Sequence, residues 1–326
     1  MLGTSLTAVK QQHNFGEVDD IDLSGTVAIV TGSGRGLGLA YAKALAGKGA
    51  DVVVNDVDQA AVGAAVEEIR AAGRGRATGV TAAVGDAATA RQLVDAAVGE
   101  FGKLDVLVTN AGILRDRVLW KMTDDEFDEV VRVHLRGTFT CARAAAVRMR
   151  EQGTGGRLIL VSSPAGQLGN FGQTNYAAAK AGIAAMARTW ALELARSHIA
   201  VNAVVPVAAT AMTRTIPAFA PAIEEAERTG QPLPDWLRRD EGLGTVEDVT
   251  GLIVFLASAA AAGITGQAIG AGGDRLTLWA HPREKAVAFA GGGWSAEAIA
   301  AEWASGIGKD PEPYGIPAPN PLGERE

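Results

Sequence analysis

The stretch Thr31-Gly32-Ser33-Gly34-Arg35-Gly36-Leu37-Gly38 joins a short apolar run, Val27–Thr31, to an alanine-rich helical pattern over Gly38–Gly47. Glycines at such a turn permit tight backbone geometry and let backbone N–H groups approach a pyrophosphate at the positive end of the helix. A turn can also be rich in glycine for steric reasons alone, and the turn by itself leaves both explanations open. As a nucleotide-binding turn, it would offer the cofactor Gly32, Ser33, Arg35, Gly36, Leu37 and Gly38.

The rest of the chain repeats this alternation of strand and helix. Short buried runs of Val, Ile and Leu predict strands at Val27–Thr31, Asp51–Asn55, Leu104–Thr109, Arg157–Ser162 and Ile199–Val205. Longer alanine-rich patterns predict helices at Gly38–Gly47, Gln59–Ala72, Ala87–Phe101, Asp124–Arg150, Tyr176–Arg196 and Val246–Ala259. The alternation predicts a single doubly wound α/β domain of the Rossmann type, a parallel sheet with helices on both faces.

Composition narrows the class of protein. Of 326 residues, 48% are apolar and 21% charged, which suits a sizeable core and excludes a disordered chain. The net charge of −7 is not that of a nucleic-acid-binding protein, and the single Cys141 excludes a disulfide framework or a multi-cysteine zinc site. The apolar stretch Leu252–Thr265 is too short to cross a bilayer, and residues 1–20 lack the pattern of a secretory signal. We expect a cytoplasmic protein with no metal site and no nucleic-acid or membrane partner.

Three segments flank or follow the strand–helix pattern of residues 22–275. Residues 1–21 are polar and predict a loosely held N-terminal arm. Residues 276–310 form an extension that holds Trp279, Trp294 and Trp303 and is too apolar to be left in water, so we expect it to pack on the core or on a partner subunit. Residues 311–326 are rich in proline and predict an extended or disordered tail.

An acidic residue ends the second predicted strand, in the sequence Val54-Asn55-Asp56. An acidic side chain about there can accept hydrogen bonds from the adenosine ribose hydroxyls, which favours NAD over NADP. A solvated Asp at a strand end is the ordinary alternative. Arg35 also complicates the assignment, because a guanidinium beside the ribose could bind a 2′-phosphate. We expect NAD as the cofactor, with NADP left open.

Three further segments carry a pattern of polar residues. Asn110-Ala111-Gly112 follows the strand predicted at Leu104–Thr109, at the carboxyl edge where ligands bind in such sheets. Ser163 follows another strand, and Lys180 lies four residues after Tyr176, on the same face of a helix. Each has an ordinary structural explanation when taken alone. Together with the glycine turn, over residues 22–275, they resemble the short-chain dehydrogenase/reductase superfamily.

The resemblance implies a division of roles in the oxidation of an alcohol. Tyr176 would be the acid/base, although a free phenol, with a pKa near 10, is a poor base at neutral pH. Lys180 would bind the ribose and lower the pKa of Tyr176. Ser163 would bind the substrate oxygen, and Ser162 would be structural. Asn110, Ala111 and Gly112 would contact the cofactor.

Two positions depart from the general pattern of the superfamily. Where many members carry Asn in the helix after Asn-Ala-Gly, this chain has His134. An imidazole there could pass protons as a catalytic residue, or it could be a satisfied helix histidine near a subunit contact. Many relatives hold Asp where Ala83 stands, so contact with adenine would come from the backbone near Val84.

The segments around Arg115, His134 and Asn175-Tyr176 narrow the resemblance to one branch. They are similar to the (3R)-hydroxyacyl-CoA dehydrogenase unit of peroxisomal multifunctional enzyme type 2, also called 17β-hydroxysteroid dehydrogenase type 4. The segment that would cover the cofactor, with Pro206, Ala209 and Thr210, fits the same branch, as does the extension with Trp294.

The branch implies an NAD-dependent dehydrogenase of 3-hydroxyacyl-CoA substrates, with a fatty or steroid acyl part. The alternatives are an NADPH-dependent 3-oxoacyl thioester or carbonyl reductase and a non-catalytic nucleotide-binding protein. Arg115 and Arg117 would meet CoA phosphates or be solvated. The family also implies a homodimer or homotetramer, paired through the helices predicted at Asp124–Arg150 and Tyr176–Arg196.

Overall fold

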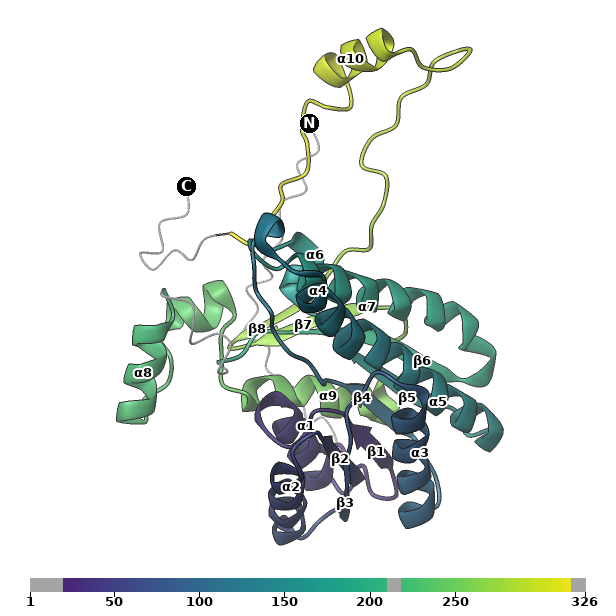
Figure 1. The fold of residues 1–326 in the computed structure, drawn as a ribbon, viewed down its shortest axis with the longest axis vertical. Helices are drawn as coiled ribbons and strands as arrows, with labels where there is room; N and C mark the ends of the chain where they lie inside the picture. Colours follow the sequence, from purple (N-terminus) through teal and green to yellow (C-terminus); the bar gives the residue numbers. More distant parts are fainter. Residues whose placement is uncertain (1–19, 210–217, 318–326) are drawn as a thin grey trace.

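The computed structural model describes residues 20–209 and 218–317. Within these ranges the chain forms one eight-stranded sheet in the order β3-β2-β1-β4-β5-β6-β7-β8. All neighbouring strands pair in parallel except β8, which is antiparallel to β7 (Figure 1). The strands are β1 Val27–Val30, β2 Asp51–Asp56, β3 Ala77–Thr81, β4 Val106–Thr109, β5 Gly156–Val161, β6 Ile199–Pro206, β7 Ala268–Gly272 and β8 Arg275–Leu278.

Helices cover both faces of this sheet, as the doubly wound prediction requires. On one face, α1, α2 and α9 pack on one apolar cluster, and on the other α3, α5 and α7 pack on a second (Figure 1). The helices are α1 Gly36–Gly47, α2 Gln59–Ala72, α3 Ala87–Phe101, α4 Asp124–Val131, α5 Gly137–Gln152, α6 Pro164–Leu168, α7 Thr174–Glu193, α8 Ala220–Thr229, α9 Thr250–Ala257 and α10 Ala296–Ser305. The predicted fold class is confirmed.

Several elements differ from the sequence-based expectation. β3, β7 and β8 were not predicted as strands, and the short helices α6 and α8 were not predicted either. The long helix expected at Asp124–Arg150 is divided into α4 and α5 by a π-helical turn at Arg132–Arg136. The helix expected from Val246 instead begins with a 3-10 turn, Glu247–Val249, before α9.

The segment between β6 and α9 forms a small apolar cluster of its own. It contains Phe219, Ile223 and Leu237, and its core includes one face of α8. Figure 1 shows α8 at the side of the molecule, beyond the carboxyl ends of the strands.

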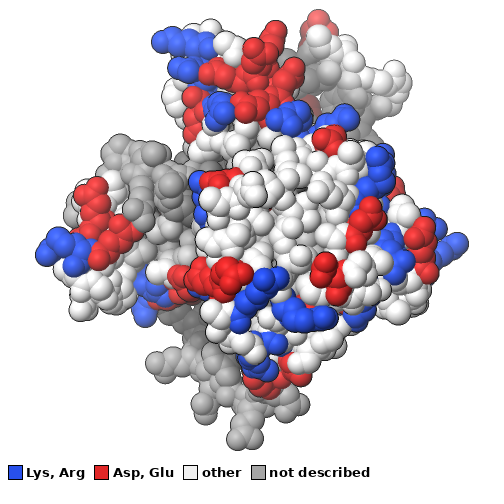
Figure 2. Space-filling model, turned by 60° about the horizontal axis from the view of Figure 1, so that its bottom comes forward, with Lys and Arg blue, Asp and Glu red and all other residues white. Residues whose placement is uncertain are grey.

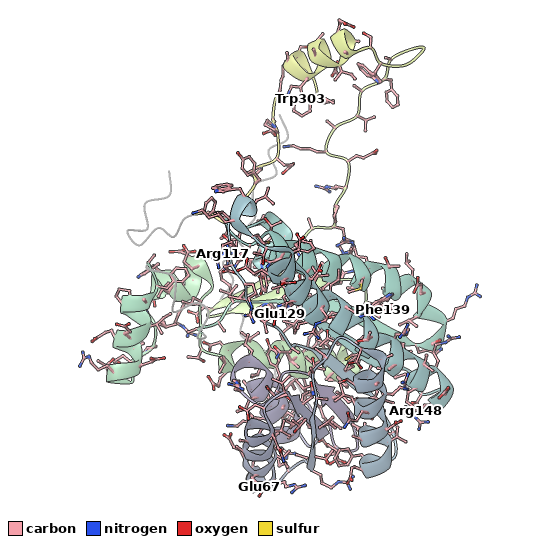
Figure 3. The ribbon with its side chains drawn as sticks, in the orientation of Figure 1. Glu67, Arg117, Glu129, Phe139, Arg148 and Trp303 are labelled. Atoms are coloured by element: carbon pink, nitrogen blue, oxygen red, sulfur yellow. The ribbon has the colours of Figure 1, made fainter. Side chains whose placement is uncertain are left out.

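The C-terminal extension leaves the body of the molecule after β8. Trp279 still packs on the core, and its backbone N–H donates to the carbonyl oxygen of Ala268 (2.9 Å). From there the chain runs outward to α10, where Trp303 is exposed (Figures 1 and 3). It then returns to the body at Gly315 and Ile316.

The surface carries charges of both signs. On the face shown in Figure 2, acidic and basic side chains lie side by side around a broad uncharged area. Among the described residues, no helix has the length and apolar character needed to span a membrane.

Candidate active site

The turn between β1 and α1 needs glycine at two positions with left-handed backbone, Gly32 (φ 62°) and Gly36 (φ 57°). A Cβ at Gly38 would lie 2.1 Å from the carbonyl oxygen of Gly32, so α1 packs directly on the turn. Arg35, the N-cap of α1, makes no capping side-chain hydrogen bond, whereas side chains do cap α2, α3, α4 and α6. The backbone N–H groups at this helix end are open to an anion, so the turn fits a dinucleotide diphosphate.

Two residues of the turn that were predicted to bind the cofactor have side chains that face the protein core. Ser33 is fully buried, where its Oγ donates to the carbonyl oxygen of Val30 (2.7 Å) and accepts from the backbone N–H of Asn55 (3.0 Å). Leu37 is half-buried against the apolar cluster under α1. These side chains shape the turn from behind by joining it to β1, β2 and the core.

The Asn110-Ala111-Gly112 segment clamps the glycine turn from the end of β4. The Asn110 Nδ2 donates to the carbonyl oxygen of Gly32 (3.1 Å), and the backbone N–H groups of Asn110 and Ala111 donate to Thr31 Oγ1 (3.0 and 3.1 Å). A Cβ at Gly32 would lie 2.6 Å from the Cα of Ala111. The two predicted cofactor segments are therefore one packed unit, and Asn110 holds the turn rather than reaching away from it.

Asp56 ends β2 beside the same turn. Its carboxylate accepts from the backbone N–H of Gly34 (3.3 Å). The guanidinium of Arg35 pairs with Asp58 (3.1 Å) and lies 3.8 Å from Asp56. Arg35 is thus held between two carboxylates, which oppose the approach of a further negative charge.

Ser163, Tyr176 and Lys180 come together at the carboxyl edge of the sheet. Ser163 is the N-cap of α6 after β5, where its Oγ accepts from the backbone N–H of Ala165 (3.2 Å), and its hydroxyl lies close enough to the Tyr176 side chain to lower the pKa of that phenol. Lys180, one turn along α7, has its Nζ 5.5 Å from the centre of the Tyr176 ring and donates to the carbonyl oxygen of Val161 (2.7 Å). Ser162 instead donates its Oγ to the backbone carbonyl oxygen of Lys180 (2.8 Å), a structural bond between β5 and α7.

Burial is the largest effect on the pKa values of Tyr176 and Lys180. It raises the pKa of Tyr176, an effect that the Ser163 hydrogen bond opposes and the negative charge of Asp116 reinforces. Burial lowers the pKa of Lys180 to about 7. In each case the low-dielectric surroundings disfavour the charged form. A phenolate at Tyr176 therefore needs a nearby positive charge.

His134 lies in the π-helical turn and contacts both Tyr176 and the Asn110-Ala111-Gly112 segment. Its ring meets the Tyr176 ring edge-on, with centroids 5.1 Å apart, and a Cβ at Gly112 would lie 2.2 Å from its Cε1. Nε2 lies 3.0 Å from the backbone nitrogen of Ile113, whereas Nδ1 has no hydrogen-bond partner among the described residues. Burial, and secondarily the charge of Lys180, lower its pKa to about 3. The pKa of about 3 favours the neutral form of the His134 ring, which lies directly beside Tyr176.

The remaining predicted cofactor residues lie around the same edge. Val84 is buried, and its carbonyl oxygen accepts a long hydrogen bond from Arg132 (3.5 Å). Pro206 is the last residue of β6, and the N–H of Ala209 donates to the carbonyl oxygen of Gly244 (2.7 Å). Thr210 lies outside the described residues.

The comparison with known proteins decides the family. The family described as short chain dehydrogenase matches residues 26–220. The hydroxyacyl-CoA dehydrogenase ChsB1 of Mycobacterium tuberculosis is 41% identical over 304 residues, which cover 89% of this chain and 92% of that protein. The chain belongs to the short-chain dehydrogenase family.

Other members of the family fit the same picture. The peroxisomal multifunctional enzyme type 2 of Drosophila melanogaster is 45% identical over 59% of this chain and 33% of that protein. A 3-oxoacyl-[acyl-carrier-protein] reductase of Synechocystis is 42% identical over 78% of this chain and 98% of that protein. A crystal structure of a short chain dehydrogenase from Mycobacterium avium superposes with a TM-score of 0.76 at 35% identity, covering 90% of this chain and 98% of that one.

Membership in the short-chain dehydrogenase family makes this protein an oxidoreductase. It is an NAD(P)-dependent dehydrogenase that acts on CH–OH groups. The glycine turn and its clamp are the part of the chain that fits such a dinucleotide.

Sequence reasoning missed a set of polar contacts around Tyr176, which we call the polar latch. Asn175, fully buried, donates from Nδ2 to the backbone carbonyl oxygens of Arg115 (3.1 Å) and Glu126 (3.0 Å). Its neighbour Gln173 donates to the carboxylate of Asp116 (2.8 Å). The segment after Gly112, the helix α4 and the start of α7 are thereby fixed to one another. The adjacency of Asn175 to Tyr176 was the only signal for it in the sequence.

The two arginines weighed as contacts for CoA phosphates are both paired with carboxylates. Arg115 lies on Glu129 (2.8 Å), and Arg117 lies on Glu126 (2.9 Å), which also completes the capping box of α4 with Thr123. Figure 3 shows Arg117 above Glu129 on the body of the molecule. The guanidinium charges of both arginines are thereby compensated by carboxylates.

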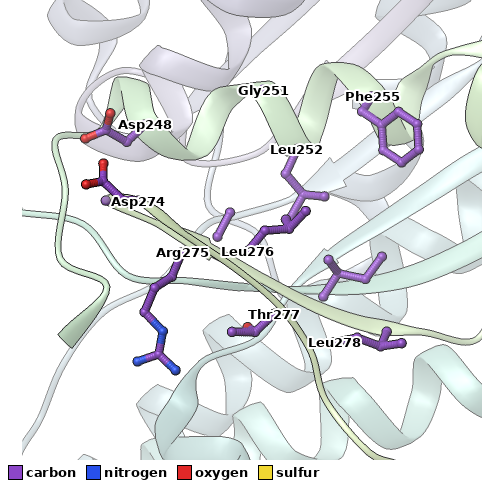
Figure 4. A pocket seen from close by; sticks show the side chains of 12 residues that line it. Asp248, Gly251, Leu252, Phe255, Asp274, Arg275, Leu276, Thr277 and Leu278 are labelled. Atoms are coloured by element: carbon purple, nitrogen blue, oxygen red, sulfur yellow. The ribbon is translucent and has the colours of Figure 1, made fainter. Parts of the chain in front are cut away.

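One cavity lies away from Ser163, Tyr176 and Lys180. It has a volume of about 680 Å³ and is lined by α9, β7 and β8, including Leu252, Phe255 and Leu276 (Figure 4). Ser163 and Tyr176 are not among its walls. Among residues 20–209 and 218–317, no group of three or more His, Cys, Asp or Glu side chains is arranged to hold a metal ion.

Proposed function

We propose that this dehydrogenase transfers a hydride between NAD and the 3-hydroxy or 3-oxo group of an acyl-CoA with a fatty or steroid acyl part. The observation that carries the proposal is the meeting of Ser163, Tyr176 and Lys180 beside the glycine turn. The substrate class is supported by the similarity to a hydroxyacyl-CoA dehydrogenase over 92% of its length.

The roles of the residues follow from their surroundings. In the oxidation direction, Tyr176 takes the hydroxyl proton, and Ser163 holds the substrate oxygen by a hydrogen bond. The ammonium of Lys180 binds the ribose and favours the phenolate of Tyr176 against the effect of burial. When bound, the nicotinamide supplies the hydride chemistry. We assign His134, whose neutral ring is in edge contact with Tyr176, a role in proton transfer: an imidazole stays neutral when it accepts a proton at one ring nitrogen and releases one from the other.

We assign NAD as the cofactor because of the charges around Arg35. A 2′-phosphate placed at this guanidinium would also face Asp56 and Asp58, which already pair with it. The ribose hydroxyls of NAD, in contrast, are donors that suit a carboxylate.

The alternative function is reduction of a 3-oxoacyl thioester with NADPH. The 3-oxoacyl-[acyl-carrier-protein] reductase that is 42% identical over 98% of its length supports it. Relative rates with NADH and NADPH on a 3-oxoacyl-CoA separate the two functions.

The assembly we propose is a homodimer or homotetramer in which the extension packs on a partner subunit. The support is the exposure of Phe289, Trp294 and Trp303 in the extension, a segment that runs outward from the body of the chain (Figure 1).

The test of the proposed function is spectrophotometric. Purified protein with NAD and a 3-hydroxyacyl-CoA should produce the absorbance of NADH. The Tyr176→Phe variant should lose about 10²- to 10⁴-fold in kcat while still binding NADH, because only the proton transfer is removed. Tyr41→Phe is the matched control: it removes a buried hydroxyl that has no partner among the described residues. Full activity of Tyr176→Phe would refute the mechanism.

A further inference from the structure

The chain leaves β6 beside the strand that leads to Ser163. Val161, the last residue of β5, is in register with Val204 of β6. Ser163 and Pro206 each follow two residues later, so the two segments leave the sheet next to each other at its carboxyl edge. We call residues 206–209 the β6 exit segment. It holds two of the residues that the sequence predicts to contact the cofactor.

The β6 exit segment is held in place by the turn before α9. The N–H of Ala209 donates to the carbonyl oxygen of Gly244 (2.7 Å), and Ala208 forms an isolated parallel bridge with the same glycine. Gly244 is itself closely packed, because a Cβ there would lie 2.3 Å from Oδ2 of Asp248 and 2.4 Å from the backbone nitrogen of Gly273. The position of Gly244 therefore determines where the β6 exit segment lies.

An ion-pair cluster fixes this turn. Oδ2 of Asp248 accepts from the backbone N–H of Thr245 (2.7 Å) and from Nη1 of Arg238 (3.0 Å). The same guanidinium donates from Nε and Nη2 to Oδ1 of Asp274 (3.0 and 2.7 Å), which lies in the turn between β7 and β8. Figure 4 shows the two aspartates next to each other at one end of the cavity. Arg238 thus connects the support of the β6 exit segment to a turn of the sheet.

Arg238 is held at its backbone as well as at its side chain. Its carbonyl oxygen accepts from the N–H of Asp274 (3.0 Å), and its neighbour Leu237 is fully buried in the small cluster between β6 and α9. The Arg238 side chain is only 20% exposed. A planar guanidinium presents several donors in a fixed arrangement, so it can hold two carboxylates at once.

We propose that Arg238 is a positioning residue for the cofactor: through Asp248 and Gly244 it holds the β6 exit segment where that segment contacts the dinucleotide. The inference rests on the proposed function, because it takes NAD as the cofactor and the β6 exit segment as part of its site. Loss of Arg238 should therefore weaken cofactor binding and leave the proton transfer at Tyr176 unchanged.

Fluorescence titration of the full chain with NADH tests the proposal. Arg238→Met and Asp248→Asn should each raise the Kd of NADH about tenfold, because each breaks a partly buried charged hydrogen bond. The double variant should also lose about tenfold rather than a hundredfold, since both changes interrupt the same connection. Arg228→Met is the matched control: it breaks an ion pair with Glu225 (2.6 Å) on α8 and should leave the Kd unchanged.

Hydrogen exchange supplies a second measurement, made without cofactor. In Arg238→Met, the amide of Ala209 should exchange about tenfold faster than in the wild type, while the amides of the central strand β4 keep their rates. A role in overall stability alone would instead raise the exchange rates in both places. At saturating NAD, kcat and its pH dependence should be those of the wild type.

The outcomes separate this inference from the proposed function. An NADH Kd in Arg238→Met within about twofold of the wild type refutes the role of Arg238, as does an equal loss in Arg228→Met. A shifted pH profile also refutes it, because Arg238 would then act on the proton transfer. A wild type that binds NADH but does not oxidise a 3-hydroxyacyl-CoA refutes the proposed function, while the Kd comparison still decides the role of Arg238. A wild type that does not bind NADH refutes both.

Discussion

Burial acts in opposite directions on the ionisable groups around Tyr176. It raises the pKa of this phenol, and it lowers the pKa of Lys180 to about 7 and that of His134 to about 3. All three groups are thereby shifted toward their neutral forms. A pKa of about 7 leaves Lys180 divided between its charged and neutral forms at neutral pH, so a negative charge beside it, such as a phenolate at Tyr176, would favour the ammonium form.

The pKa of His134 predicts a pH dependence of stability. Because it lies near 3 in the folded protein and near 6.5 in the unfolded chain, the unfolded chain binds more protons between these values. The free energy of unfolding should therefore fall as pH drops from about 6.5 toward 3, and this part of the slope should be absent in His134→Asn. Urea unfolding at several pH values measures it, with the exposed His281→Asn as control. Parallel curves for wild type and His134→Asn would contradict the assignment.

The position of Asp56 predicts a preference for NAD over NADP. Asp56→Ala should lower kcat/KM with NAD by about tenfold or more, the worth of a hydrogen bond to a charged group, while changing kcat/KM with NADP little. Steady-state kinetics with both cofactors measures the change. If the wild type used NAD and NADP with equal efficiency, Asp56 would have no such role.

Among the helices and strands, those marked by a local sequence pattern could be predicted. Those that depend on the close approach of distant backbone segments could not. The glycine turn, Tyr176 and Lys180 could be placed from sequence because each depends on neighbours within one strand–helix unit. Strand β7, with the sequence Ala-Ile-Gly-Ala-Gly, lacks a strand signal because its glycines accommodate neighbouring backbone: a Cβ at Gly272 would lie 2.2 Å from the carbonyl oxygens of Val207 and Gly242.

The π-helical turn at Arg132–Arg136 was likewise beyond sequence reasoning. No proline or glycine precedes it, and its effect is to present His134 to Tyr176. The latch of Asn175 was missed for a similar reason, since its partners are backbone carbonyl oxygens of a distant segment. Tertiary contacts of this kind do not produce a periodic pattern of residues in the sequence, so sequence reasoning does not detect them.

Helix α1 provides a prediction with its control in the same element. Gly38→Ala would put a Cβ 2.1 Å from the carbonyl oxygen of Gly32, so the turn and the helix must move apart. We expect NADH binding, measured by fluorescence titration, to weaken by tenfold or more, about 1.4 kcal/mol. Gly47→Ala meets no atom within 4 Å and should leave binding unchanged while adding about 0.5–1 kcal/mol of helix stability. Equal NADH affinity in both variants would show that the close packing of the turn does not matter.

In the whole molecule, the extension is the part whose apolar side chains are not buried by the rest of the described chain. The body buries its apolar residues in two clusters on the faces of the sheet. In contrast, α10 has no buried residue, and Ile299 and Trp303 are exposed on it. Leaving such side chains in water forgoes about 1.5–3 kcal/mol each relative to burial, so a second surface that covers them would stabilise the assembly.

Cross-linking tests whether that second surface belongs to another copy of the chain. Benzoylphenylalanine in place of Trp303, in a mixture of two differently tagged full-length chains, should on illumination give a product of twice the 33.5 kDa chain mass that carries both tags. The same probe in place of Glu67, which lies on α2 at the opposite end of the molecule in Figure 3, should give none. Trp303→Glu should weaken the assembly in analytical ultracentrifugation, because a carboxylate would be buried where an indole packed. Products confined to one chain would mean that α10 folds back on its own core, and the extension would then not join subunits.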